Sequence, residues 1–512
     1  MTDEKRADQH ANGRESEQAT NTLDVRQLAS KVLTSSTFNI SSSAITLVLG
    51  FTRSVVLARL LLPEHFGIMA LAMFFMNLAA RIQGFGFDSA LIHRQADRDE
   101  VISTHFVLRA SLGVVLVVVA LIAAPFLGYA YPEQPGLGQI VIAIAVLEMI
   151  KCFNATPRVL LSKELNFKRL AFLDVMSSVA AFAVAVPLAW GGAGVWSLVG
   201  EQASGVLVRV LGLWVFKRPW KISLKIDREL VKWYFRFGAY NFLSANLNFL
   251  LDRFDDFWTG TFLGSTALGF YSKAYEFAHY PRRVIASPVT SVFFSTFAKL
   301  QHDRERLSKA FFRVSSLVIR VGFLFAGTFA LITPEFIKIF LGNQWAPMAF
   351  TFQLMLLYTL FDPLLVIASN LTTAVGEPQA LTKVKLLQMV FFVPAVALLG
   401  HFFGIDGVAV AADLMLILGI VIILPRVRHY VDFSALRMMG YPTLGLILAL
   451  AITLLVERQL HLPNAILVLI SKAMVMSIVY GIILFAFERE QVFNSLRLVA
   501  SLLPRRGQAL KS

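Results

Sequence analysis

Charged side chains occur inside apolar segments that are long enough to cross a membrane. Arg53 and Arg59 lie within the apolar segment 38–62, and the run Asp252 to Asp256 lies in the middle of segment 240–263. A charge at the centre of a bilayer costs roughly 2.5–3.5 kcal/mol on insertion scales, and it is tolerated where it faces a bundle interior or a wet cavity. Charges at matched places in both halves of the chain therefore predict a polar cavity inside a membrane protein.

The cations in these segments have the chemistry to bind an anion. Arginine offers a planar, bidentate donor set, so a cationic cavity would neutralise a phosphate or a sugar carboxylate. We expect Arg53 and Arg253 to form the deep pair, supported by Arg59, Arg81 and Lys273. The carboxylates expected as charge partners are Asp88, Asp252, Asp255, Asp256 and Glu276.

Two other interpretations of these charges stay open. Carboxylates and cations can pair to lock helices together, and residues near span ends can extend their charged groups to the membrane surface. Arg59, Arg81 and Asp88 lie close enough to span ends for the second interpretation. A proton- or sodium-coupled transporter needs a buried acidic site, for which the candidates are Glu201, Asp362 and Asp413.

The remaining composition narrows the class of protein. The chain has 56% apolar and 16% charged residues, against about 45–50% and about 25% in soluble domains, which indicates a membrane protein with many spans. Nothing in the sequence has the spacing of a metal site, a nucleophile–base constellation or a cofactor motif, so we expect neither catalysis nor a cofactor. The net charge of +14 falls in short loops between spans, which favours contact with anionic lipid head groups over nucleic acid.

The elements that must position the charges are membrane-spanning helices. A helix needs about 20 mostly apolar residues to cross the bilayer, and the sequence predicts an all-α polytopic protein with about fourteen such spans. The four that carry the charges are 36–61, 66–88, 236–262 and 266–297. With both termini in the cytoplasm, the outside loops hold Arg59, Lys338 and Arg458 while the other loops are rich in Lys and Arg, as the positive-inside rule requires.

The chain also repeats itself, with two matches at offsets of about 213 and 214 residues and a third, looser one. Phe126-Leu127-Gly128 returns as Phe340-Leu341-Gly342, and the segment from Leu62 to Gly67 corresponds loosely to the segment from Leu263 to Gly269. This predicts two pseudo-symmetric lobes of six helices in the same orientation, followed by two C-terminal helices. The predicted organisation is a disordered cytoplasmic tail (1–30), an N-lobe (31–216), a cytoplasmic linker (217–235), a C-lobe (236–430), two further spans (431–487) and a basic cytoplasmic tail (488–512).

Several of these segments together resemble a known family. The run from Arg53 to Gly67, RSVVLARLLLPEHFG, is similar to the first-loop signature of bacterial polysaccharide-unit flippases, the Wzx-like members of the multidrug/oligosaccharidyl-lipid/polysaccharide exporter superfamily. The runs 86–94, 162–170, 263–275 and 297–307 resemble later loops of that family in the same order. The resemblance covers roughly residues 30–430 and is nearest to the colanic-acid or exopolysaccharide exporter branch.

This resemblance carries functional expectations. It implies a two-lobed bundle whose cavity is lined by helices 1, 2, 7 and 8, the four helices that hold the buried charges. It implies transfer of an undecaprenyl-pyrophosphate-linked oligosaccharide across the bacterial inner membrane, with a polysaccharide polymerase and a chain-length regulator as partners. The acidic pair Asp255-Asp256 departs from a simply cationic cavity. An ion-coupled multidrug or cation antiporter of the same fold is the alternative function.

Overall fold

The chain folds into α-helices throughout its described part. The computed structural model describes residues 38, 41–93, 99–164, 166–215, 224–280, 282–283, 287–459 and 462–502, so the predicted tail 1–30 lies outside the described residues. A first span, Ser41–Leu60, precedes the labelled elements. These are α2 (Pro63–Gly84), α3 (Phe87–His93), α4 (Asp99–Ala130), α5 (Leu137–Lys163), α6 (Phe167–Trp190), α7 (Val195–Val215), α8 (Arg228–Phe262), α9 (Gly264–Ala278), α10 (Ser287–Leu300), α11 (Arg304–Phe336), the short turns η2 (Ile337–Leu341) and η3 (Asn343–Met348), α12 (Ala349–Ala374), α13 (Pro378–Val427), α14 (Ala435–Gln459) and α15 (Ala465–Leu502).

Ten helices in the described part of the chain are long and apolar enough to cross a membrane. They confirm an all-α membrane protein with many spans, while the count of fourteen stays a prediction. One of the ten, α13, is 50 residues long and bends at Gly404, whose φ of 60° is open to glycine without strain. Helices α2, α8 and α9 are not among the ten, and α9, with 15 residues, is too short to cross a membrane by itself.

The predicted span 266–297 is divided in the structure. Helix α9 ends at Ala278 and α10 begins at Ser287. The sequence between them contains Pro281, a residue type that lacks the backbone N–H needed to continue an α-helix. Lys273 and Glu276 of the predicted span therefore lie on a short helix of their own, α9, and Arg282 and Arg283 follow after its end.

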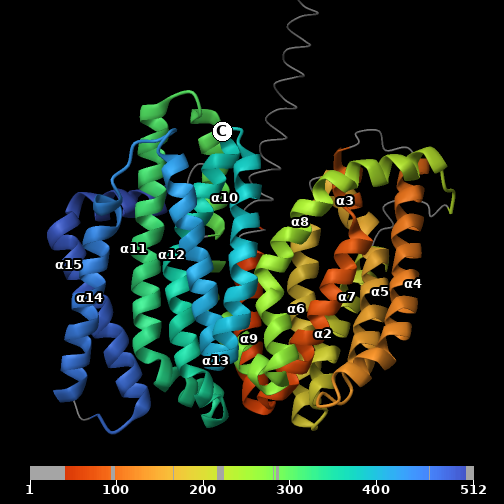
Figure 1. Cartoon of the computed structure of the whole chain (residues 1–512), viewed down its shortest axis with the longest axis horizontal. Helices are drawn as coiled ribbons and strands as arrows, with labels where there is room; N and C mark the ends of the chain where they lie inside the picture. The colour runs from red at the N-terminus through yellow and green to blue at the C-terminus, as the bar shows by residue number, and fades with distance from the viewer. Residues whose placement is uncertain are drawn as a thin grey trace, which may run out of the picture.

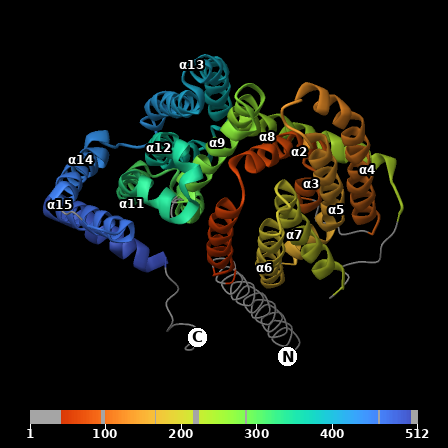
Figure 2. The ribbon, with the colours of Figure 1, turned by 90° about the horizontal axis from the view of Figure 1, so that it is seen from below.

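The helices form two groups that stand side by side (Figure 1). The first span and α2 to α7 make the N-terminal group, and α9 to α13 make the C-terminal group, with α14 and α15 packed on the outer side of α11 (Figure 2). Helix α8 contacts both groups: its first turns bury Leu230 and Tyr234 against Phe87 and Val101, and its later part packs on α9 and α13.

The two groups meet closely where α2 crosses α9. A Cβ atom on Gly67 would lie 1.7 Å from the carbonyl oxygen of Ser265, and one on Gly269 would lie 1.9 Å from the carbonyl oxygen of Pro63. The contact is reciprocal, because each glycine faces the first turn of the other helix. Gly67 and Gly269 are the glycines that end the two corresponding segments of the sequence repeat, so the repeated segments build this crossing together.

Candidate functional site: a charged cavity between the two helix groups

A cavity of about 250 Å³ lies between the two groups, beside the crossing of α2 and α9. The first span, α2 and α7 line it from one side, and α8, α9 and Arg283 line it from the other. Its polar lining side chains are Arg53, Ser54, Glu201, Gln202, Arg253, Ser272, Lys273, Tyr275, Glu276 and Arg283. Three of the five predicted cations, Arg53, Arg253 and Lys273, are therefore brought together in one cavity.

Arg53 lies on the first span and faces α7. Its guanidinium forms an ion pair with Glu201 at 2.9 Å, and the two side chains are 20% and 15% exposed. The pair joins two helices that are far apart in sequence. Glu201, predicted as an ion-coupling group, is in this structure the partner of a cavity arginine.

Arg253 lies on α8 and is held within its own helix. Its Nη1 atom is 2.8 Å from Oδ2 of Asp256, one turn along α8, so the two side chains form an ion pair. Asp256 is 7% exposed, whereas the Arg253 side chain is 42% exposed. The guanidinium also lies 5.8 Å from the centre of the Tyr275 ring. Arg253 therefore presents its free face to the cavity while one face stays neutralised.

Lys273 links the two helix groups inside the cavity. Its Nζ atom donates to Glu276 at 2.7 Å, on the same helix, and to Ser54 Oγ of the first span at 2.8 Å. The ammonium group also lies 4.2 Å from the centre of the Phe66 ring of α2, within range of a cation–π contact. Glu276 thus forms an ion pair with Lys273 inside the cavity.

The other predicted carboxylates have different surroundings. Asp255 is buried and accepts a hydrogen bond of 2.5 Å from the Tyr271 hydroxyl, so a phenol takes the place of the expected arginine. Asp252 is exposed on α8. Asp88 lies outside the cavity, 3.2 Å from His105 Nε2 and 3.4 Å from Arg109 Nε.

Arg59 and Arg81 are not part of the cavity lining. Arg59 is exposed at the end of the first span and donates to the carbonyl of Ile339 at 2.7 Å. Gln344 and the buried Trp345 also donate to backbone carbonyls of this helix end, so the C-terminal group covers it. Arg81 lies over the Phe249 ring at 4.8 Å. Both residues lie close to helix ends, as the snorkelling interpretation expects.

The two remaining candidates for ion coupling lie in the C-terminal group. Asp362 of α12 forms an ion pair of 2.9 Å with Arg282. Asp413 of α13 is buried, and its Oδ1 atom has no hydrogen-bond partner among the described residues. Of the three carboxylates, Asp413 is the one without an ion pair in the described part of the chain.

The lining has more cations than carboxylates. Arg53, Arg253, Lys273 and Arg283 face Glu201 and Glu276, which leaves two positive charges in excess, or one when the adjacent Asp256 is included. Tyr275 and Ser54 add hydroxyl groups that sequence reasoning missed. The sequence could have pointed to both residues, because Ser54 follows Arg53 directly and Tyr275 lies between Lys273 and Glu276. Such a site can hold a compact anion such as a phosphate.

Two known proteins are similar in sequence to most of this chain. The succinoglycan biosynthesis transport protein ExoT of Rhizobium meliloti (strain 1021) is 28% identical over 492 residues, which covers 92% of this chain and 96% of that protein. The lipopolysaccharide biosynthesis protein WzxC of Escherichia coli (strain K12) is 24% identical and covers 77% of this chain and 80% of that protein.

Solved structures show the same fold. The lipid II flippase MurJ in an inward closed conformation superposes with a TM-score of 0.75 over 90% of this chain and 100% of that chain, at 13% identity. A multidrug resistance transporter of the MATE family, inward-facing, gives 0.58 over 77% of this chain and 95% of that chain, at 19% identity. The fold and the cavity thus define a multi-pass helical membrane protein built like these transporters.

The family of the chain follows from a match to a family of related sequences. The family described as "Polysaccharide biosynthesis protein" matches residues 56–350, more than half of the 512 residues. The chain belongs to this family, and the match confirms the resemblance predicted from its loops.

Proposed function

We propose that this protein is a flippase that carries a lipid-linked oligosaccharide across the membrane for the synthesis of an extracellular or surface polysaccharide. The observation that carries the proposal is the excess of cations in a cavity between two helix groups, in a chain similar to polysaccharide transport proteins. The undecaprenyl pyrophosphate of the substrate would neutralise these cations. Arg53 and Arg253 contact the diphosphate or acidic sugars, and Lys273 supports them, whereas Arg59 and Arg81 lie outside the lining.

The size of the cavity favours a mechanism of alternating access. About 250 Å³ is below the roughly 300–1,000 Å³ of pockets that hold drug-sized ligands, so a sugar unit requires a wider cavity. The α2–α9 crossing and the contacts of Trp345 and Gln344 close one end. Separation of the two groups at that end would release the substrate to the other side.

The setting of this activity is part of the proposal. We place the chain in the bacterial inner membrane with both termini in the cytoplasm, an N-lobe at 31–216 and a C-lobe at 236–430. A polysaccharide polymerase and a chain-length regulator would take over the transferred unit. Reporter fusions at both termini test the orientation, and a periplasmic signal from either fusion would contradict it.

Export measurements test the function. The gene should restore polymer export in a strain that lacks its own polysaccharide flippase, and purified protein should transfer a fluorescent lipid-linked sugar between the leaflets of proteoliposomes. An ion-coupled drug antiporter, the alternative, would instead raise drug resistance and leave the fluorescent lipid in place. That second pattern would overturn the flippase assignment.

We also propose Asp413 as the ion-coupling carboxylate. Its burial and its lack of an ion pair among the described residues support this role, whereas Glu201 and Asp362 each have an arginine partner. D413N should abolish substrate-driven proton or sodium uptake in proteoliposomes. Asp406, on the same helix and bound by the Thr351 hydroxyl, provides the matched control D406N, which should retain uptake. Normal uptake by D413N would exclude the role.

A further inference from the structure

A second cavity, of about 800 Å³, lies where α11 and α14 begin and where α15 bends. It is separate from the charged cavity between the two helix groups and shares no lining residue with it. Its charged lining residues are Lys309, Arg313, Asp432, Arg437, Glu488, Arg489 and Glu490. Its aromatic lining residues are Phe312, Phe433, Tyr441 and Phe487.

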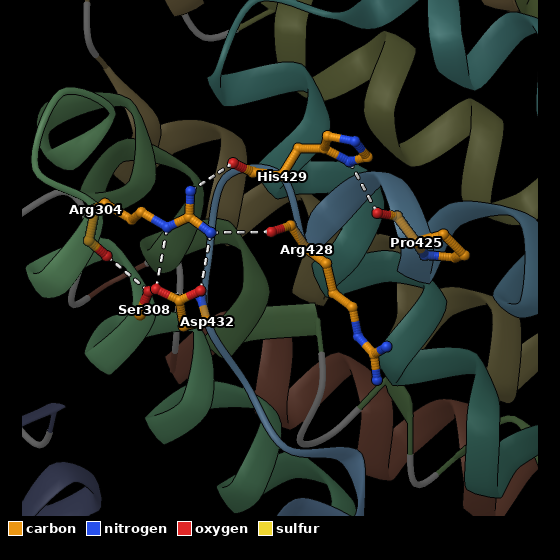
Figure 3. A network of polar contacts seen from close by, with 6 residues as sticks. All are labelled: Arg304, Ser308, Pro425, Arg428, His429 and Asp432. Carbon is orange, nitrogen blue, oxygen red and sulfur yellow. Dashed lines mark hydrogen bonds and ion pairs between the residues drawn. The ribbon is translucent and has the colours of Figure 1, made fainter.

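Two of the three lining carboxylates are already neutralised from outside the cavity. Asp432 receives two hydrogen bonds from Arg304, at 2.8 and 3.0 Å, and Arg304 also donates to the carbonyls of Arg428 and His429 (Figure 3). The backbone N–H of Asp432 donates to Ser308 Oγ at 2.8 Å. This network fixes the loop that forms one wall of the cavity.

The second carboxylate, Glu488, holds the bend in α15. It forms a buried ion pair with Arg320 of α11, with N···O distances of 2.6 and 3.0 Å, and its backbone leaves the helical region at φ −136° and ψ 37°. The helix therefore changes direction at Glu488, and Arg489 follows at the cavity. The Arg489 guanidinium lies 5.5 Å from the Phe485 ring and 5.8 Å from the Phe493 ring.

Three arginines of the lining remain available to a ligand. Arg313, Arg437 and Arg489 are exposed and form no ion pair within the described part of the chain, and Glu490 is the one remaining carboxylate to oppose them. Lys309 pairs with Glu305. The charge that is not neutralised by an ion pair is thus positive, and it comes from three different helices that line the same cavity.

The surroundings of the cavity are those of a membrane surface. Below it, α14 exposes Leu444 and Ile447, and α15 exposes Ile478 and Ile482, in the directions that acyl chains occupy beside a spanning helix. Tyr441 stacks on Phe487 at 5.8 Å where these apolar surfaces reach the charged lining. Aromatic side chains with an apolar body are favoured at this depth of a bilayer, and basic pockets between spanning helices bind acidic lipid head groups.

We propose that this cavity binds the phosphate head group of an acidic glycerophospholipid, such as phosphatidylglycerol, held by Arg313, Arg437 and Arg489. The acyl chains lie along α14 and α15. The site is independent of the flippase assignment, because the ligand is a resident lipid of the membrane and none of its residues lines the central cavity.

Lipid binding to the full-length protein tests the proposal. Native mass spectrometry of the purified protein would count bound phosphatidylglycerol against phosphatidylcholine over a range of lipid concentrations. The variant R313Q/R437Q/R489Q should bind phosphatidylglycerol at least tenfold more weakly, since each cation near an acidic lipid contributes about fivefold. The three side chains are exposed, so the variant should fold, and R313K/R437K/R489K should recover most of the binding.

The matched control is R306Q. Arg306 lies on α11 outside the cavity, is 76% exposed and pairs with Asp303, so its loss should leave lipid binding unchanged. A further measurement asks whether free phosphate binds the same site, by adding inorganic phosphate to protein held in phosphatidylcholine. Equal phosphatidylglycerol binding by the triple glutamine variant and the wild type would overturn the site. Displacement of phosphatidylglycerol by millimolar inorganic phosphate would overturn its assignment to a lipid.

Discussion

The two walls of the central cavity hold their arginines in different ways. On the side of the first span, Arg53 pairs with Glu201 of another helix. On the side of α8, Arg253 pairs with Asp256 one turn away on the same helix. The sequence repeat predicts these two arginines as counterparts, and both line the same cavity.

This difference between the two ion pairs separates two roles of a cavity arginine, which are helix packing and the positive charge of the cavity. An ion pair between helices ties their positions together, so Arg53 contributes to packing as well as to the charge of the cavity. An ion pair within one turn leaves the packing of α8 to its apolar side chains. Arg253 is therefore the cation that can change its partner for a substrate phosphate with less structural consequence.

The largest expected effect concerns export by variants that remove a whole ion pair. R53Q/E201Q and R253Q/D256N each remove one cation and its carboxylate, so neither leaves a buried unpaired charge. Export of polymer should fall by about tenfold or more for each, since a hydrogen bond to a charged group contributes about 1.5–3 kcal/mol. Export at the wild-type rate by either variant, at equal protein level, would remove its arginine from the substrate site.

The next effect is on stability and separates the two walls. R53Q and R253Q should each destabilise the folded protein by on the order of 3 kcal/mol, because the partly buried Glu201 or the buried Asp256 then lacks its cation. Adding D256N should restore R253Q fully. Adding E201Q should restore R53Q only in part, because the tie between two helices is also lost. Thermal unfolding in detergent measures all four variants, and equal rescue at both sites would contradict the distinction.

A third effect tests what the two halves share. G269A and G67A should each push α2 and α9 apart, because the new Cβ would overlap a backbone carbonyl oxygen of the other helix. A forced shift of this kind costs about 1–3 kcal/mol. Because the crossing closes one end of the central cavity, a cysteine placed at that end should be labelled several-fold faster in these variants. G322A is the control, since nothing lies within 4 Å of a Cβ there. Unequal effects of G67A and G269A would break the symmetry of the crossing.

The smallest effect concerns the ion pair between Arg304 and Asp432, which lies outside both walls of the central cavity. The hydrogen bond from Arg304 lowers the pKa of Asp432 below 3.8, so the folded state binds this proton less readily than the unfolded state. The stabilising contribution is present above about pH 4 and is lost as the pH falls through the folded-state pKa. Comparing the thermal unfolding of wild type and D432N between pH 6 and pH 3 should show a small difference that disappears at the acidic end. A difference that grows there would be inconsistent with the lowered pKa.

The sequence by itself determined the class of protein, its family and the segments that carry the cavity charges. Charge inside an apolar span is costly wherever the span lies, so Arg53, Arg253 and Lys273 could be singled out without knowing their neighbours. The short-range partners were also predictable, because Asp256 and Glu276 lie one helical turn from their cations and share a helix face with them.

The tertiary structure alone decided which distant groups meet. Arg53 and Glu201, Lys273 and Ser54, and Arg320 and Glu488 are each more than 140 residues apart, and their contacts depend on how helices pack in three dimensions. Helix packing also places Arg59 and Arg81 outside the lining of the central cavity. It forms the second cavity from three separate segments of the chain. The sequence shows that a charged side chain lies inside an apolar span, where it is costly. Which group neutralises that charge depends on how the helices pack.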